Sequence, residues 1–343
     1  GRRVASTGAW TRLGRVARRL LRRLPAPVII VPPELANDEF AGPVMLATDI
    51  TDSSAAAARF AVAFARERVQ SRDVGAPKNP SVPIIRHPDV RRMLLRMRAQ
   101  TEAARALAIA TGYAFDLAEA HPDAEVRKAN QAFVELMIPV HKGWATEMAQ
   151  DVTYQGIQVH GGMGFVEETG AAQHYRDARI TTIYEGTTAI QANDLVGRKM
   201  AREGGVTAKA LITTMRAFCA ELAKSSNPHL KASHKRLVEG IDAVERAVEF
   251  NLGNFNQNVR ACFAGSVPMV KLFGIVCGGW QLARVALAAE QRINAGSDDR
   301  AFLEAKIATM RYFADTMIPE AIAAAEVIVN GSEGTLALAE AAF

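Results

Sequence analysis

The sequence is poor in cysteine, and this shortage excludes a disulfide-stabilised fold. Only three of the 343 residues are cysteine, Cys219, Cys262 and Cys277, and none of their spacings matches a CxxC site. An odd, scattered set of this kind is typical of a reducing compartment, so we expect a cytoplasmic protein. Each cysteine is expected to act as a small apolar side chain of the core.

Aromatic residues and long hydrophobic runs are also scarce. Phe, Trp and Tyr together make up 6% of the chain. No stretch of about 18 uninterrupted apolar residues occurs, so we expect no membrane-spanning segment. Hydrophobic residues nevertheless account for 49% of the sequence and charged residues for 22%, which is the composition of a globular protein. A length of 343 residues predicts about two domains.

Acidic residues are missing from the first 25 positions, which hold eight arginines. Without this arm the net charge of the chain falls from +5 to −3. An arginine-rich arm is typical of nucleic-acid or anionic-lipid binding or of an import peptide, and a non-native terminus would look the same. Because a basic arm alone is weak evidence, we do not expect nucleic acid as a partner. We expect residues 1–25 to contribute little to the fold.

Alanine is abundant in segments that also contain Leu, Met, Arg and Glu, and this composition predicts an all-α fold. Short loops between long predicted helices favour an antiparallel helical bundle followed by a second helical bundle domain. We expect a basic, proline-rich atypical segment over 1–50, a first helical domain over 51–204 and a second over 205–343. The Gly204-Gly205 pair marks the boundary between the two domains.

The predicted helices have the following approximate limits. In the first domain they cover a stretch capped by Asp52-Ser53-Ser54 and running to about Arg72, then 88–120, 124–150, 169–179 and 187–202. In the second domain they cover 207–225, 232–262, 267–295 and 299–329. Residues 25–50 are expected to form an irregular connector, and residues 154–165 a glycine-rich loop.

Three segments differ from this helical background, and the first is strongly cationic. It reads Ala-Arg-Glu-Arg-Val-Gln-Ser-Arg over residues 65–72. Arginines at a helix end complement the negative end of the helix dipole, which would be a purely structural role. Guanidinium groups also bind phosphate oxygens well, so the segment is a candidate anion site.

The second segment, Gln-Val-His-Gly-Gly-Met-Gly-Phe over residues 158–165, holds three glycines within four positions. Glycines let a ligand approach the backbone closely, but they serve tight turns equally well. Their spacing is neither that of a Rossmann fingerprint nor that of a P-loop. His160 has no second histidine at metal-binding spacing, so we expect no metal site.

The third segment contains Glu185 between an Ile-Tyr pair and Gly186, directly before a helix capped by Thr187 or Thr188. A carboxylate beside apolar groups loses hydration, which makes it a stronger base and a candidate for proton abstraction. An acidic residue before a helix can equally serve to complement the helix dipole.

Taken together and in this order, the three segments resemble one family. Arg-Glu-Arg-x-Gln-x-Arg, Gln-x-His-Gly-Gly-x-Gly-Phe and Tyr-Glu-Gly-Thr-Thr-x-Ile-Gln are similar to the C-terminal helical domain of acyl-CoA dehydrogenases, over about residues 57–202. Residues 203–343, with Phe-Gly-x-Val-x-Gly-Gly-Trp at 273–280, resemble the additional helical domain of the longer members. The family's N-terminal helical domain and middle β-domain do not fit within the first 55 residues, so we expect the chain to lack both.

The resemblance implies FAD-dependent oxidation of an acyl-CoA thioester to the trans-2-enoyl-CoA, a reaction of fatty acid β-oxidation. Glu185 would accept the α-proton, FAD would accept the hydride, and Gly186 would lie beside the substrate. The residues that match FAD contacts of the family are Arg68, Gln70, Gln158, Gly161, Gly162 and Thr187. The resemblance also implies a homo-oligomer and an electron-transfer flavoprotein or a similar electron acceptor.

Two other functions stay open at this point. The chain could be a non-catalytic helical interaction module that keeps the fold without flavin, or an acyl-CoA oxidase that passes electrons to oxygen. Bound oxidised flavin absorbs blue light, so the visible spectrum separates the flavoprotein from an empty module.

Overall fold

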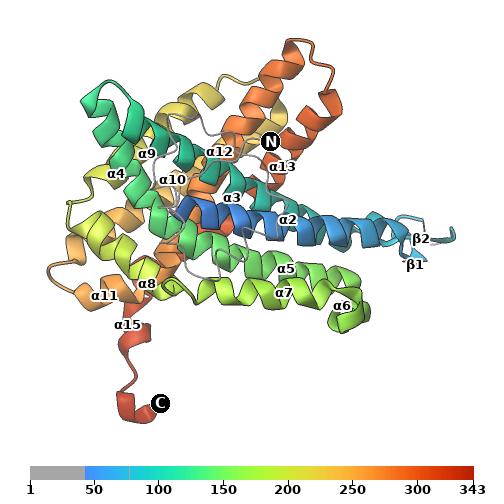
Figure 1. Ribbon diagram of the computed structural model, residues 1–343, viewed down its shortest axis with the longest axis horizontal. Coiled ribbons are helices and arrows are strands. Elements are labelled where there is room, and N and C mark those ends of the chain that lie inside the picture. The colour runs from blue at the N-terminus through green and yellow to red at the C-terminus, as the bar shows by residue number, and fades with distance from the viewer. Residues whose placement is uncertain (1–42, 77) are drawn as a thin grey trace, which may run out of the picture.

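The structure, a computed structural model, describes residues 43–76 and 78–343. Nearly all of these residues are helical, and two short strands form the one sheet found among them (Figure 1). The all-α prediction is therefore confirmed, with the addition of a small β-hairpin that the sequence analysis did not anticipate. The expectation for residues 1–25 lies outside the described residues.

The first half of the described chain forms a set of long helices joined by short turns. Its helices and strands are α2 (Pro43–Glu67), β1 (Val69–Arg72), β2 (Ser81–Pro83), α3 (Pro88–Ala120), α4 (Ala124–Val140), α5 (Thr146–His160), α6 (Gly162–Phe165), α7 (Ala171–Arg179) and α8 (Thr188–Asn193). Its single turns are the 3-10 turns η3 (Ile84–Arg86), η5 (Glu167–Thr169) and η6 (Ile180–Thr182) and the π-helical turns η4 (His141–Ala145) and η7 (Asp194–Ala201).

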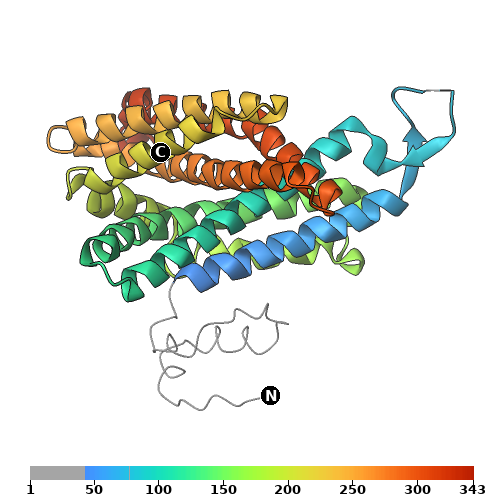
Figure 2. The ribbon, with the colours of Figure 1, turned by 90° about the horizontal axis from the view of Figure 1, so that it is seen from above.

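The second half is built from a second group of helices that lies against the first (Figure 2). In chain order they are α9 (Val206–Leu222), α10 (Pro228–Asn254), α11 (Val259–Ala264), α12 (Ser266–Asn294), α13 (Arg300–Thr316), α14 (Ile318–Asn330), α15 (Ser332–Leu336) and the 3-10 turn η8 (Glu340–Ala342). One hydrophobic cluster contains residues of both halves, so the two groups of helices share a core. The division at Gly204-Gly205 into two domains stays a prediction.

Helix α3 begins and ends where the sequence predicted. Pro88 lies in its first turn, where a proline costs no hydrogen bond because the N–H groups there have no partner within the helix. Residues of α3 at spacings of three and four form its buried face, which includes Leu94, Met97, Thr101, Ala104 and Ala108. At the start of α4 the Asp123 carboxylate accepts from the backbone N–H of Glu125 at 2.8 Å and caps the helix.

The predicted limits of the first helix were wrong at both ends. Helix α2 already begins at Pro43, so residues 43–50 are not an irregular connector, and Asp52-Ser53-Ser54 lies inside the helix instead of capping it. The helix ends at Glu67, and residues 69–72 leave it to pair antiparallel with Ser81–Pro83. The Asp73 carboxylate accepts from the Gly75 N–H at 3.0 Å and supports the reversal of the chain. The cationic segment 65–72 therefore consists of the end of α2 and the first strand of a hairpin.

The predicted loop over 154–165 is also wrong in its first half. The helix expected to end near Gln150 passes through the π-helical turn η4 and continues as α5 to His160, so only Gly161 interrupts the helical backbone before α6. Pro139 lies just before η4 and lacks an N–H group. Local widening of the helix is a common response to such a missing hydrogen bond.

Two helices predicted as continuous in the second half are each divided. Residues 255–258 separate α10 from α11, and the Asn258 side chain accepts from the Ala261 N–H at 3.3 Å to cap the second of them. Pro319 lies in the first turn of α14 and separates it from α13, because proline is tolerated at a helix start but not in a helix interior.

Helix α12 runs through the middle of the fold and contacts α3, α10, α13 and α14. Its length and composition would allow it to cross a membrane, but 78% of its most hydrophobic window is buried inside the protein. The core helix of a globular protein passes the same test, so α12 is explained by its position. The three cysteines are buried and unpaired, which confirms their predicted role as small core side chains.

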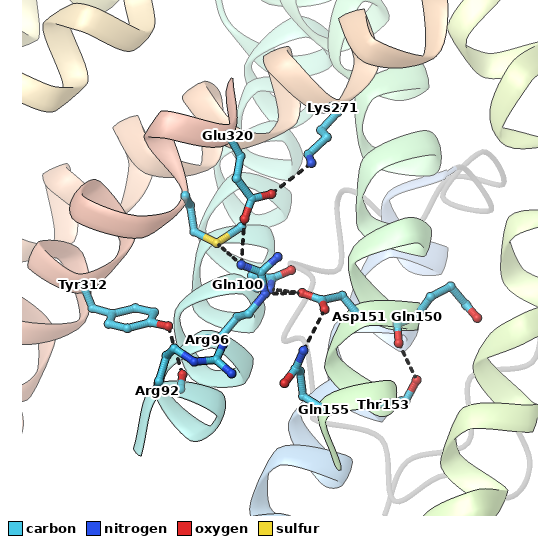
Figure 3. Close-up of polar contacts among 11 residues, drawn as sticks. Arg92, Arg96, Gln100, Gln150, Asp151, Thr153, Gln155, Lys271, Tyr312 and Glu320 are labelled. Carbon is cyan, nitrogen blue, oxygen red and sulfur yellow. Dashed lines mark hydrogen bonds and ion pairs between the residues drawn. The ribbon is translucent and has the colours of Figure 1, made fainter. Parts of the chain in front are cut away.

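A partly buried polar network joins the two halves (Figure 3). Arg96 on α3 donates from Nε to Asp151 on α5 at 2.6 Å and from Nη1 to Glu320 on α14 at 2.7 Å. Lys271 on α12 lies 2.9 Å from the second oxygen of Glu320. Burial opposes ionisation of Glu320, but hydrogen bonds from Arg96 and Lys271 outweigh it and lower the pKa of this carboxyl. Two cations and two anions thus connect four helices.

Candidate functional site

The segment between α7 and α8 holds Glu185 in an unusual backbone conformation. Glu185 has a φ of 54°, in the left-handed region, and Gly186 follows with a φ of 91°. A non-glycine residue in this region costs about 1–2 kcal/mol, so surrounding contacts have to maintain it. The Glu185 side chain is exposed to solvent. Strain of this kind concentrates at functional sites, and here it affects the one residue that the sequence analysis named as a base.

Helix α8 fixes the position of this segment. The Gln191 side chain donates to the backbone carbonyl of Glu185 at 3.3 Å. Gly186 is favoured by its φ of 91°, and a Cβ atom there would lie 2.9 Å from Nε2 of Gln191, the mobile end of a flexible side chain. Thr187 is the N-cap of α8, and its hydroxyl accepts from the Ile190 N–H at 3.4 Å, as the sequence predicted. Thr188 donates to Glu147 on α5 at 2.6 Å.

A buried lysine that the sequence analysis missed lies next to this segment. Lys142 belongs to the π-helical turn η4 and is 6% exposed. Its ammonium group donates to the Thr181 carbonyl at 2.6 Å and lies 5.1 Å from the centre of the Tyr184 ring. Burial lowers the pKa of Lys142, and the negative charge of Glu185 partly offsets this effect. No motif of the sequence marks this lysine, so only the fold reveals its position.

The glycine-rich segment forms the corner between α5 and α6. Gly161 ends α5 with a φ of 61°, and a Cβ atom at Gly161 or Gly162 would meet no atom within 4 Å. The backbone of the corner is therefore open to an approaching ligand. Gln158 is exposed on the last turn of α5 beside this corner.

His160 lies under the same corner. It is 5% exposed, stacks on Phe64 at 4.3 Å between ring centres, and its Nδ1 lies 2.8 Å from the Gly156 carbonyl. Its Nε2 is buried and has no hydrogen-bond partner among the described residues. A buried polar atom without a partner is costly, and a ligand that reached this nitrogen would remove the cost.

Arg68 and Gln70 lie on the hairpin. Both side chains are exposed, and the chain between them is held by backbone contacts. The Arg68 carbonyl accepts from the Ile84 N–H at 2.8 Å, and the Gln70 carbonyl lies 2.9 Å from Nε2 of His87. Their side chains are thus presented to solvent from an ordered backbone.

The structure brings two of the three motifs together and keeps the third apart. The hairpin and the α5–α6 corner lie toward the same end of the long helices, whereas Glu185 follows the other end of α7 (Figure 1). The nine residues of α7 correspond to a separation of about 14 Å along the helix axis. Any ligand that touched all three motifs would have to be long, or the contacts would have to come from more than one copy of the chain.

Exposed apolar side chains surround these positions. Among them, Phe165 is 82% exposed, and a further group is about half exposed: Met163, Ile180, Ile183 and Ile190. They form two groups, Met163 and Phe165 on α6 before α7 and the three isoleucines after it. Exposed large apolar residues are typical of a surface that contacts a ligand or another protein.

Metal and thiol chemistry find no support in the described part of the chain. No group of three or more His, Cys, Asp or Glu side chains is arranged there to hold a metal ion. Burial raises the pKa of the Cys219 thiol to about 11 and that of Cys277 to about 12, which makes both poor nucleophiles.

Comparison with known proteins covers both halves of the chain. Residues 47–200 match the family model described as "Acyl-CoA dehydrogenase, C-terminal domain", and residues 211–339 match the one described as "Acetyl-CoA dehydrogenase C-terminal like". The chain belongs to the acyl-CoA dehydrogenase family. The first match includes the Arg68, Gln158 and Glu185 segments, and the second includes the glycines of α12. The family resemblance of the sequence is therefore confirmed.

Curated relatives of this family match at substantial identity. The chain is 48% identical over 276 residues to a 3-methylmercaptopropionyl-CoA dehydrogenase of Ruegeria pomeroyi. This match covers 80% of this chain and 46% of the relative. It is 34% identical over 299 residues to the broad-specificity linear acyl-CoA dehydrogenase FadE5 of Mycobacterium tuberculosis. This match covers 82% of this chain and 48% of the relative. The chain thus spans about half the length of the curated relatives it matches.

Solved structures share the fold. An acyl-CoA dehydrogenase of Bacillus anthracis, complexed with FAD, has a TM-score of 0.65 at 20% identity and covers 85% of this chain and 48% of its own. ACDH-11 of Caenorhabditis elegans, in complex with C11-CoA, has a TM-score of 0.57 at 16% identity. This match covers 84% of the present chain and 42% of ACDH-11. Acyl-CoA dehydrogenases therefore share this arrangement of helices.

Proposed function

We propose that this chain supplies the catalytic base and part of the FAD-binding surface for oxidation of an acyl-CoA thioester to its trans-2-enoyl-CoA. The observation that carries the proposal is Glu185. Its exposed carboxylate follows an Ile-Tyr pair, its backbone is held in a left-handed conformation, and Gln191 and the cap of α8 fix its position. A positioned base of this kind contributes on the order of 10²–10⁴-fold to a reaction rate.

Proton removal requires that the thioester come close to Glu185. Gly186 has no side chain, so an acyl-CoA carbonyl can approach the backbone beside the base. The α-proton of a thioester is only weakly acidic, and a carboxylate removes it when the site excludes water and orients the carbon. The exposed apolar side chains near the segment, Ile180, Ile183 and Ile190, are suited to cover such a substrate.

FAD, when bound, accepts the β-hydrogen of the substrate as a hydride. The residues proposed to hold it fit that task. Arg68 presents a cation to solvent beside Gln70, and a guanidinium suits a pyrophosphate. Gly161 and Gly162 leave an open backbone surface next to Gln158 and to His160, whose Nε2 has no partner among the described residues. Thr187 lies two residues after the base.

The separation of these groups favours an oligomer. The hairpin and Glu185 are at different ends of α7, so one flavin contacted by both motifs requires either a long bound molecule or two copies of the chain. The exposed apolar residues around α6 and α8 support self-association. Sedimentation of the chain at micromolar concentration should therefore show a species heavier than the monomer, and a clean monomer would argue against this part of the proposal.

The electron acceptor is proposed to be an electron-transfer flavoprotein or a similar protein of the cytoplasm. An acyl-CoA oxidase of Arabidopsis thaliana shares the fold with a TM-score of 0.55 at 14% identity, which leaves oxygen as the alternative acceptor. Hydrogen peroxide formed in step with enoyl-CoA would identify an oxidase. Enoyl-CoA formed only when an artificial electron acceptor is added would identify a dehydrogenase.

The test is a chimaera in which residues 47–339 of this chain replace the matching half of the Ruegeria pomeroyi relative. Under anaerobic conditions, acyl-CoA should bleach the visible absorbance of its flavin. Glu185→Gln should lower that rate at least 100-fold while flavin and acyl-CoA stay bound. Glu168→Gln is the matched control, because Glu168 is an exposed glutamate of the turn η5, at the other end of α7. Equal rates for the two variants would refute the proposal, and a colourless chimaera would refute its FAD-binding part.

A further inference from the structure

We propose that Lys142 is a positioning residue that clamps the Glu185 segment from inside the bundle. This inference deepens the function proposed above and rests on Glu185 being the base. No other described lysine lies as deeply buried as Lys142, which is among the few buried polar residues of the chain. Lysines are almost never fully buried without a partner, so its contacts need a physical explanation.

The contacts of Lys142 bracket the residues just before Glu185. Its ammonium group donates to the Thr181 carbonyl at 2.6 Å, at the 3-10 turn η6. The same group lies 5.1 Å from the centre of the Tyr184 ring, the residue that precedes Glu185. A charged donor makes a stronger hydrogen bond than a neutral one, and a cation over an aromatic face is attracted to the ring. Both contacts oppose movement of the segment that holds Glu185 in its left-handed conformation.

The charges around Lys142 come from several elements. The negative charge of Glu185 favours the charged form of the Lys142 ammonium group and so raises its pKa. Glu147 on α5 accepts from Thr188, and Arg179 on α7 donates to Thr182, so both are already engaged. His141, beside Lys142 on η4, is buried, and burial lowers its pKa to about 4, so it is neutral near pH 7. Among these groups, Glu185 is the one whose negative charge acts on the pKa of Lys142.

Helix α12 holds the turn that carries Lys142. A Cβ atom at Gly278 would lie 2.7 Å from the ring of Trp144, and a Cβ atom at Gly143 would lie 2.7 Å from Val270. The turn η4 is thus packed between the base segment and α12 with no spare room. The second half of the chain supports Glu185 through this turn, although it contributes none of the proposed FAD or substrate contacts. π-helical turns of this kind are frequent at functional sites.

The first test follows the motion of the segment in the 343-residue chain and needs no activity. The amides of Ile183 and Tyr184 donate to the Ile180 carbonyl, so their hydrogen exchange reports opening of the segment. Lys142→Met should speed their exchange by at least about tenfold relative to the remaining amides. Lys199→Met is the matched control, because Lys199 forms its 3.0 Å ion pair with Glu135 on α4 and not with the Glu185 segment. Equal exchange in the two variants would overturn the proposal.

The second test keeps Lys142 in place and therefore does not depend on the folding of a lysine variant. Coupling between two charges is reciprocal, so removing the Glu185 carboxylate should lower the pKa of the Lys142 ammonium further. Nuclear magnetic resonance of the lysine ε-carbons measures this pKa in the chain carrying Glu185→Gln and in the control Glu168→Gln. A Lys142 pKa that is the same in both variants would overturn the clamp.

The outcomes separate this inference from the proposed function. If Lys142→Met loosens the segment but Glu185→Gln leaves flavin reduction unchanged in the chimaera, the clamp stands and the role of Glu185 as the base is wrong. If Glu185→Gln abolishes flavin reduction but Lys142→Met changes neither exchange nor the reduction rate, the base stands and the clamp is wrong.

Discussion

Trp144 and Gly274 are in contact across the boundary between the two halves of the chain, and no side chain larger than hydrogen fits at Gly274. A Cβ atom there would collide with the indole ring. Trp144 belongs to the turn η4 and Gly274 to α12, so this single contact joins the helix of the second half to the turn beside Glu185. Gly274 and Gly278 of α12, which the sequence analysis noted only as part of a motif, are explained by the space that Trp144 needs, whereas Gly279 faces Phe313 and Ile318.

Gly274→Ala should therefore destabilise the fold. Overpacking a core typically costs 1–3 kcal/mol and occasionally more, and a collision with a rigid ring places this variant near about 3 kcal/mol. Urea unfolding followed by circular dichroism measures the change. Gly253→Ala is the control, because a Cβ atom at this exposed position of α10 would meet nothing within 4 Å. That variant should be stabilised by about 0.5–1 kcal/mol, and equal effects of the two variants would contradict the packing described.

The network around Arg96 should stabilise the junction between the two halves (Figure 3). Arg96→Met leaves the Asp151 and Glu320 carboxylates partly buried without their main donor. We expect a loss of about 2 kcal/mol, below the value for a fully buried pair because the three side chains are 21–29% exposed. The exposed pair Arg311–Asp315 is the control, and Arg311→Ala should cost less than about 0.5 kcal/mol. Equal losses would show that the network contributes no more than a surface ion pair.

The stability of the fold should fall between pH 6.5 and pH 4 because of His141. Burial lowers the pKa of His141 from 6.5 to about 4, so the folded protein keeps it neutral while the unfolded chain binds a proton. The contribution of neutral His141 to the free energy of unfolding is complete above pH 6.5. It is lost as the pH falls toward 4, and the total loss is up to about 3 kcal/mol. His141→Gln can keep the contact with Thr111 but cannot titrate. The free energy of unfolding should change less between pH 7 and pH 4.5 in His141→Gln than in the parent chain. An equal change in both would show that His141 does not cause the loss of stability.

Much of the helical fold was accessible from the sequence because its signals are local. The limits of α3 follow from Pro88 and from the 3-to-4 spacing of apolar residues, and the start of α8 follows from Thr187. The hairpin was missed because Val69 to Arg72 carry no strand alternation, and their pairing depends on residues 9 to 14 positions away. The breaks after α10 and α13 depend on one Asn cap and one proline, which compete weakly with strong surrounding helix formers.

The candidate site was accessible only in part. Glu185 and the glycine corner carry distinctive neighbours in sequence, but the left-handed conformation of Glu185 depends on contacts with α8. Lys142 is an ordinary residue in the sequence, 43 positions before Glu185, and only the fold brings its ammonium group to Thr181 and Tyr184. The separation of the hairpin from Glu185 likewise follows from the length of α7 and not from any motif.

The central claim, that Glu185 is the base, is tested most directly by proton exchange at the α-carbon. The substrate 3,3-dimethylbutyryl-CoA has α-hydrogens but none on its β-carbon, so proton removal can be observed without oxidation. In deuterium oxide, the chimaera should incorporate deuterium at the α-carbon, which mass spectrometry detects, and Glu185→Gln should slow this exchange at least 100-fold with acyl-CoA still bound. Exchange in Glu185→Gln at the rate of the parent chimaera would show that another group removes the proton.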